Sequence, residues 1–463
     1  MNRLALTLAA IILITFIANG VDLPQSDSGS KIIQSNEIRD KLSSNTPINY
    51  YNKTILGDLD LRRLNETSSP IQIINCTFLG NIKFDSLAFA EPIDFRRSIF
   101  INECSFKGAK FYKDVTFEDV QFTGDAIFAN SEFRKLSDFA GCIFCEEANF
   151  GKCKFNSSSF KRAKFLNSAT FSLAEFSADS KMDEINFTKN AYFIGSQFRS
   201  DADFKNSEFN ERADFHNVDF IGDAVFTSAR FNGTAIFHEA RFDEDANFDD
   251  AMFFVVANFK RAYFRKDAFF WGASFAENSL SLDGAKFTRF ITRWDDLQDC
   301  LLYNEIIYSA LIKNFKDLGR VGDANDCYYE YMNNRQKDGF WDFLASALSY
   351  FSCGYGVRLG RTILICASLI ILFGFVYRNR KGIEKLETNS VDISPSIIYH
   401  IWDRMRRSYA LQCLHFSAKV FVGGKSEKIS LVNGCEYLAT LERILGWFFF
   451  ALVVGVLTRT MIG

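Results

Sequence analysis

The chain has 463 residues, of which 48% are hydrophobic, enough to build a large buried core. Its formal net charge is only −3, so the composition gives no signal for binding a polyanion such as nucleic acid. The most unusual feature is the count of 52 phenylalanines against 5 prolines. Such a bias indicates that one residue type is used at regular, repeated positions.

The N-terminal residues 1–20 have the pattern of a secretory signal peptide. Arg3 supplies a basic start, an apolar run extends from Leu4 to Ala18, and Ala18-Asn19-Gly20 provides a small-x-small cleavage site. An uncleaved anchor is the alternative, and either version sends the following chain out of the cytoplasm. Residues 21–53 are polar and mixed, and we expect a linker with one short helix there.

Residues 54–290 carry a repeat with a period of eleven residues. Phenylalanines follow one another at alternating steps of five and six, and a small residue, most often Ala, stands two positions before nearly every one. In the most regular window we expect these phenylalanines to form the core: Phe204, Phe209, Phe215, Phe220, Phe226, Phe231, Phe237, Phe242, Phe248, Phe253, Phe259, Phe264, Phe270 and Phe275.

The repeat favours short strands over a helix. Although an eleven-residue period also occurs in right-handed helical coils, steps of five and six would scatter the phenylalanines around a helix. On a strand, the two apolar residues of Ala-x-Phe point to the same side. Polar residues after each Phe, such as Asn232-Gly233, indicate corners. Since no unit can bury its Phe alone, the units must stack as a parallel β-solenoid.

This pattern resembles the pentapeptide-repeat family, whose repeat is close to A-[DN]-[LF]-x-x. The resemblance implies an all-β, right-handed, four-sided parallel β-helix with the aromatic and the small residue both inside. Here one residue is added for every two pentapeptides. Four faces would then take about 22 residues per coil, and ten or so coils would give a rod on the order of 50 Å long.

Four cysteines occupy the small-residue position of the repeat, two residues before a Phe. Cys76, Cys104, Cys142 and Cys153 are therefore expected to be small core residues. Cys142 also forms a C-x-x-C motif with Cys145, but no second cysteine pair follows at the spacing of a zinc site. In the repeat, Cys142 is expected to point inward and Cys145 outward. We expect no metal site there.

The sequence contains no recognisable catalytic constellation. The four histidines are scattered, and His216 and His238, which each follow a core Phe, are expected at exposed corners. There is no P-loop, no H-E-x-x-H and no G-x-G-x-x-G. We therefore expect no enzyme activity, no catalytic residue, no metal and no cofactor. Some pentapeptide-repeat proteins mimic DNA with an acidic rod, but interspersed Lys and Arg make that role unlikely here.

After the repeat the periodicity becomes helical. Residues 291–338 predict a helical hairpin that caps the open end of the solenoid. Residues 339–356 place aromatic side chains on one broad face, which is typical of a helix at a membrane surface. Residues 357–377 and 438–462 contain apolar runs with basic flanks and predict two transmembrane helices.

The loop between the two apolar helices, residues 378–437, is rich in Lys and Arg. The positive-inside bias places this loop in the cytoplasm, so the solenoid lies on the extracytoplasmic side of a multi-pass membrane protein. The signal segment independently leads to the same orientation.

The C-terminal part carries a second resemblance. Leu441-Glu442-Arg443-Ile444-Leu445-Gly446-Trp447-Phe448-Phe449 and the TRT-MI ending are similar to the inner helix of two-transmembrane pore-loop ion channels. The resemblance implies a re-entrant segment, which would be residues 408–424. The T-V-G-Y-G filter of such channels is absent, and a cytoplasmic loop conflicts with an outward-facing pore. The pore-loop candidates are Lys419, Val422, Gly423 and Gly424.

Three function classes remain, of which an enzyme comes last. A membrane-anchored, non-enzymatic rod would act as an interaction or structural scaffold, with the lipid bilayer and either an unknown protein or a second copy of the chain as partners. The alternative is an ion channel or a channel-derived membrane protein, for which ions would be the ligand. Neither reading involves nucleic acid.

Overall fold

The computed structural model describes residues 32–336, 339–385, 409–424, 429–432 and 434–462. The chain divides into two compact units. The first consists of Met1–Thr292 with Cys300–Leu302, and the second of Arg293–Asp299 with Tyr303–Gly463. The predicted signal segment, residues 1–20, lies outside the described residues.

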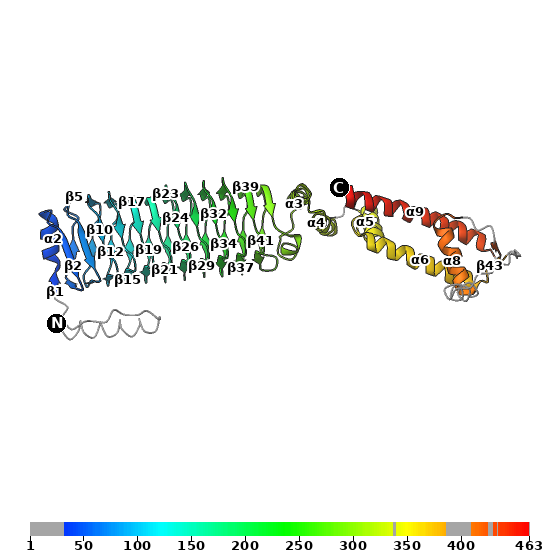
Figure 1. Cartoon of the computed structure of the whole chain (residues 1–463), viewed down its shortest axis with the longest axis horizontal. Helices are drawn as coiled ribbons and strands as arrows, with labels where there is room; N and C mark the ends of the chain where they lie inside the picture. The colour runs from blue at the N-terminus through cyan, green and yellow to red at the C-terminus, as the bar shows by residue number, and fades with distance from the viewer. Residues whose placement is uncertain (1–31, 337–338, 386–408, 425–428, 433, 463) are drawn as a thin grey trace, which may run out of the picture. The chain divides into compact units, whose positions relative to one another are not determined.

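The first unit is a parallel β-solenoid with four short strands in each coil (Figure 1). One coil contains β10 (Ile93–Asp94), β11 (Ile99–Phe100), β12 (Cys104–Ser105) and β13 (Lys110–Phe111), after which β14 (Val115–Thr116) pairs in parallel with β10. The register between neighbouring coils is 22 residues over most of the solenoid, as between Phe100 and Phe122. The predicted coil length and the parallel solenoid are thereby confirmed.

The strands form three sheets that run along the solenoid. A 12-stranded sheet contains β1 (Ile32–Gln34), β3 (Thr54–Leu56), β7 (Thr77–Phe78), β11, β15 (Gln121–Phe122), β18 (Ile143–Phe144), β21 (Lys164–Phe165), β25 (Asn186–Phe187), β29 (Glu208–Phe209), β33 (Arg230–Phe231), β37 (Met252–Phe253) and β40 (Ser274–Phe275). An 11-stranded sheet contains β4 (Leu59–Asp60), β8 (Ile82–Lys83), β12, β16 (Ala126–Ile127), β19 (Ala148–Asn149), β22 (Ala169–Thr170), β26 (Ala191–Tyr192), β30 (Ala213–Asp214), β34 (Ala235–Ile236), β38 (Ala257–Asn258) and β41 (Leu280–Ser281).

The third sheet joins the two remaining faces and has 19 strands. It contains β2 (Ile48–Tyr51), β5 (Glu66–Thr67), β6 (Ile71–Ile74), β9 (Ala88–Phe89), β10, β13, β14, β17 (Glu132–Asp138), β20 (Lys154–Ser159), β23 (Glu175–Phe176), β24 (Ser180–Lys181), β27 (Gln197–Phe198), β28 (Ala202–Asp203), β31 (Asp219–Phe220), β32 (Ala224–Val225), β35 (Arg241–Phe242), β36 (Ala246–Asn247), β39 (Tyr263–Phe269) and β42 (Lys286–Ile291). Long strands such as β17 pass from one face to the next without a corner, and this merges the two faces into one sheet.

The eleven-residue period arises because two kinds of corner alternate. In the five-residue step from Phe117 to Phe122, Asp119 has a φ of 56°, and the N–H of Val120 donates to the carbonyl of Phe117 at 2.9 Å. A positive φ at the third residue and this hydrogen bond are typical of a type II turn. The six-residue step from Phe122 to Phe128 contains no residue with a positive φ. The added residue therefore belongs to every second corner.

One coil is shorter, and a bulge absorbs the difference. The three steps from Phe150 to Phe165 are five residues each, so one corner lacks its added residue. Between β17 and β20, Phe133 pairs with Phe155 at a register of 22, whereas Leu136 pairs with Ser157 at a register of 21. Because of this bulge in β17, the core side chains of the next face point inward again.

The core of the solenoid is a set of phenylalanine ladders. Phe231 has no exposed surface and stacks on Phe209 at 4.9 Å and on Phe253 at 4.7 Å, with ring planes 3° and 2° apart. Phe237 meets the same ring edge-on at 5.9 Å. Thirteen of the fourteen predicted core phenylalanines are buried, and Phe275 is partly exposed because β40 ends its sheet and no further coil covers it. The four repeat-phase cysteines are buried as well.

Both ends of the solenoid are covered within the first unit. At the N-terminal end, α2 (Ser35–Ser43) buries Ile38 and Leu42, and β1 and β2 pair with later strands. The solenoid therefore starts at residue 32, ahead of the predicted boundary at residue 54. At the other end, residues Cys300–Leu302 return to β41, where the N–H of Leu280 donates to the carbonyl of Cys300 at 2.9 Å.

The second unit is helical. It contains η1 (Trp294–Asp296), α3 (Glu305–Asp317), α4 (Val321–Asn334), α5 (Phe340–Cys353), α6 (Leu359–Asn379), α8 (Tyr409–Phe421), α9 (Cys435–Ile462) and a small hairpin of β43 (Ile383–Lys385) with β44 (Ile429–Leu431). The predicted hairpin of residues 291–338 is present as α3 and α4, and the Asn304 side chain caps α3 by accepting from the N–H groups of Ile306 and Ile307. Its predicted capping of the solenoid stays a prediction.

Helices α6 and α9 are long and apolar enough to cross a membrane. Their most apolar windows have mean hydropathies of 2.2 and 1.8, and only 17% and 22% of those windows are buried within the protein. The predicted spans, 357–377 and 438–462, agree with the observed helices to within three residues. The predicted sequence of solenoid, hairpin and two apolar helices is confirmed.

Truncation of an inward ring should destabilise the solenoid far more than truncation of an outward ring. We expect Phe231→Ala to cost roughly 3–5 kcal/mol, because it removes stacking contacts on both sides and leaves a cavity. Phe254→Ala is the matched control, since this ring is 50% exposed and its loss should cost less than about 1 kcal/mol. Thermal unfolding followed by circular dichroism measures both. Equal shifts of the two midpoints would contradict the core assignment.

Candidate functional site

Among the clusters of polar groups in the described residues, one in each unit has the geometry of a candidate site. On the flank of the solenoid, His216, His238 and Glu239 place their ligand atoms within 4.8 Å of one another. In the helical unit, the carboxyl of Glu442 is completely buried between helices.

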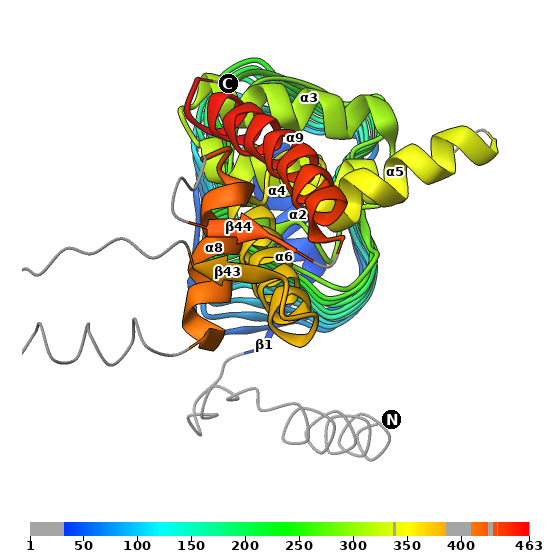
Figure 2. The same cartoon turned by 90° about the vertical axis from the view of Figure 1, so that its right-hand side faces the viewer.

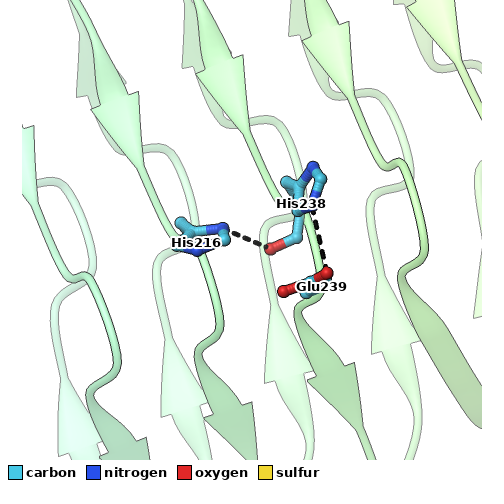
Figure 3. A group of neighbouring side chains, drawn as sticks. All are labelled: His216, His238 and Glu239. Carbon is cyan, nitrogen blue, oxygen red and sulfur yellow. Dashed lines mark hydrogen bonds and ion pairs between the residues drawn. The ribbon is translucent and has the colours of Figure 1, made fainter.

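The flank cluster results from the coil length. His216 follows Phe215 after β30, and His238 follows Phe237 after β34. Strands β30 and β34 pair in parallel with a register of 22 residues, so the two imidazoles lie one above the other with centroids 5.1 Å apart (Figure 3). Both side chains are partly exposed. The inward direction of the preceding Phe directs each histidine outward.

Three polar contacts hold the flank cluster. The His216 Nδ1–H donates to the backbone carbonyl of His238 at 3.1 Å, and His238 Nε2 lies 3.3 Å from Glu239 Oε1 (Figure 3). From the next coil, Arg261 donates to the same carboxylate oxygen at 3.0 Å. The Arg261 hydrogen bond lowers the pKa of Glu239. Two imidazoles and one carboxylate are a ligand set that a divalent metal ion can use.

Sequence reasoning placed both histidines at exposed corners but did not bring them together. The signal was present, because their separation of 22 residues equals the coil length. Glu239 was not singled out, and it stands at the left-handed corner position with a φ of 56°.

The helical site depends on α8, which lies against both α6 and α9 (Figures 1 and 2). Two glycines allow this approach. A Cβ atom on Gly446 of α9 would lie 1.8 Å from the carbonyl oxygen of Phe421, and one on Gly374 of α6 would lie 3.1 Å from the Cα of Leu414. Small residues let helix backbones pack closely where side chains would keep them apart.

Glu442 joins the three helices through hydrogen bonds. Tyr377 of α6 donates to Glu442 Oε2 at 2.8 Å, and Ser417 of α8 contacts Glu442 Oε1. The Ser417 hydroxyl also lies 2.8 Å from the carbonyl of Ile370, so its single proton cannot serve both acceptors. A neutral carboxyl that donates to Ser417 completes the network without a buried charge. Sequence reasoning had named Glu442 only within the segment that is similar to the inner helix of a pore-loop channel.

The four pore-loop candidates cluster at the C-terminal end of α8. Lys419 and Val422 are exposed. Gly423 has a φ of 84°, its N–H donates to the carbonyl of Val420, and the N–H of Gly424 donates to the carbonyl of Lys419 at 2.8 Å. This pair of bonds is the Schellman motif that ends a helix. In the described residues the glycines therefore act as a helix cap, and nothing there forms a carbonyl-lined filter.

Comparison with known protein families finds one match. A family described as "Pentapeptide repeats (9 copies)" matches residues 73–121, 106–146, 117–164 and 183–230, all within the solenoid. The match covers less than half of the chain and leaves the helical unit without an assigned relative. No curated protein matches the chain.

The buried carboxyl should be needed for its hydrogen bonds and not for its charge. We expect Glu442→Ala to destabilise the helical unit by about 2–4 kcal/mol, because Tyr377 and Ser417 lose their partner and a cavity remains. Glu442→Gln should cost less than half of that, since its amide can accept from Tyr377 and donate to Ser417. Thermal unfolding in detergent micelles compares the two variants. A Gln variant as unstable as the Ala variant would contradict this network.

Proposed function

We propose that this protein is a membrane-anchored scaffold in which the pentapeptide-repeat solenoid presents an interaction surface on the extracytoplasmic side of a bilayer. The observation that carries the proposal is the outward apolar surface of α6 and α9. Within the helical unit, Leu364 of α6 is 69% exposed and Phe450 of α9 is 67% exposed. Water is a poor environment for so many exposed large apolar side chains, whereas lipid covers them at no cost.

Helix α5 supports the same proposal. Phe340, Trp341 and Phe351 are between 69% and 77% exposed on one helix. Gly354, in a left-handed conformation, ends α5 shortly before α6 begins. An amphipathic helix with exposed aromatic residues next to a membrane span is suited to the bilayer interface, where its rings lie among lipid headgroups. We propose this position for α5.

The solenoid surface is suited to binding and not to chemistry. Charges of both signs pair between neighbouring coils, as in Lys189 with Glu211 at 2.7 Å and Lys161 with Asp183 at 2.6 Å. Such exposed pairs contribute little to stability. Because charges of both signs alternate, the surface has no large region of positive or negative electrostatic potential. A protein partner or a second copy of the chain fits this surface better than nucleic acid does.

The orientation of the scaffold can be tested with two introduced cysteines. Tyr51→Cys lies on the solenoid, and Tyr437→Cys lies at the start of α9, where the native side chain is 85% exposed. We expect a membrane-impermeant thiol reagent to label Tyr51→Cys on intact cells and Tyr437→Cys only after permeabilisation. The unmodified protein serves as background, since nine of its eleven cysteines are buried. Labelling of Tyr437→Cys on intact cells would contradict the proposed orientation.

A channel-derived module is the second candidate, and one observation favours it. From Leu414 to Ser417 the partners on α6 go back from Gly374 to Ile370, so α8 runs antiparallel to α6. From Ser417 to Phe421 the partners on α9 advance from Glu442 to Gly446, so α8 runs parallel to α9. Because α9 continues well past Gly446, α8 reaches only part of the way along the pair. A short helix inserted between two spanning helices is the arrangement of a pore-loop module.

Reconstitution distinguishes the scaffold from the channel. If the helices serve only as an anchor, purified protein in liposomes should carry no potassium-selective current, because no filter carbonyls are provided by residues 409–424. A current that changes its ion selectivity in Lys419→Glu, but not in the control variant Tyr437→Phe on exposed α9, would place the channel function first. The liposomes are fused with planar bilayers that separate two different salts, because the reversal potential of the current then reports its ion selectivity.

A further inference from the structure

We propose that His216, His238 and Glu239 form a binding site for a divalent transition-metal ion, represented by Zn²⁺, on the flank of the solenoid. The three residues come from two adjacent coils and converge on one small volume (Figure 3). This site is independent of the membrane helices and of the proposed scaffold function.

The spacing of the ligand atoms fits a small metal ion. Around tetrahedral Zn²⁺, metal–ligand bonds of about 2.0–2.1 Å place neighbouring ligand atoms about 3.3 Å apart. His238 Nε2 and Glu239 Oε1 already lie 3.3 Å apart. All the ligand atoms of the cluster lie within 4.8 Å of one another, so none has to move by more than about 1.5 Å to reach this spacing.

A hydrogen bond prepares His216 as a ligand. Because the Nδ1–H of His216 donates to a backbone carbonyl, the neutral ring keeps its lone pair on Nε2. Such a second contact to the non-ligating nitrogen is the usual support for a metal-binding histidine.

The residue types select the class of metal. Two imidazoles favour Zn²⁺, Ni²⁺ and Cu²⁺ over Ca²⁺ and Mg²⁺, which prefer sites made only of oxygen atoms. The three side chains leave a fourth position open, and their partial exposure allows water to occupy it. Arg261 opposes binding, because its guanidinium shares the Glu239 oxygen and its charge repels a cation.

The test is a calorimetric titration of full-length protein in detergent with Zn²⁺ at pH 7.5, after removal of any histidine tag. We expect one Zn²⁺ site that is lost in the double variant His216→Ala/His238→Ala and is weakened roughly tenfold in Glu239→Gln. His415→Ala is the matched control, since His415 is an exposed histidine on α8, and it should bind as the parent protein does.

Arg261→Ala provides a second measurement that removes no ligand. Loss of the competing cation should tighten Zn²⁺ binding by at least threefold, and circular dichroism of each variant verifies that the solenoid is intact. Absence of Zn²⁺ binding to the parent protein at millimolar concentration would overturn the proposal. A Zn²⁺ titration that is unchanged in the double variant would also overturn it. An unchanged Zn²⁺ affinity in Arg261→Ala would contradict the role of Glu239 as a ligand.

Discussion

The stacking of phenylalanine on phenylalanine between coils is the interaction on which the solenoid depends. Each strand is only two residues long in most of the coils, so backbone pairing along one strand provides very few hydrogen bonds. The ring of Phe231, in contact above, below and at its edge, is typical of every coil in the regular window. Burial of this aromatic surface compensates the conformational entropy lost by a chain that turns every few residues.

The same stacking decides what the outside of the solenoid looks like. A coil of 22 residues places residues of equal phase directly above one another, so the surface consists of columns and not of isolated side chains. Columns explain why Asn232, which follows a core Phe, donates to Asn210 at 2.7 Å although it belongs to a corner. They also explain why two histidines far apart in the sequence become neighbours. The register between coils therefore determines which side chains lie together on the flank and are available for binding.

The helical unit is held together on a different principle. Its apolar helices cannot rely on the hydrophobic effect against one another if lipid surrounds them, so close backbone contact and buried hydrogen bonds become the specific interactions. Gly374 and Gly446 supply the contact, and Glu442 with Tyr377 and Ser417 supplies the hydrogen bonds. This explains why the Glu442 carboxyl is tolerated between the packed helices.

The sequence alone determined those helices and strands that are marked by a local pattern of residues, such as a repeat or an apolar run. The steps between phenylalanines predicted the strands, the inward residues and the coil length, because strand phase and core burial depend on residues two to six positions apart. Runs of apolar residues predicted α6 and α9 for the same reason. Only the tertiary structure decided that α2, β1 and β2 belong to the solenoid, that α8 lies between two helices, and that Glu442 is buried. Those features depend on contacts between segments that are far apart in the sequence, and a local pattern does not record which segments meet.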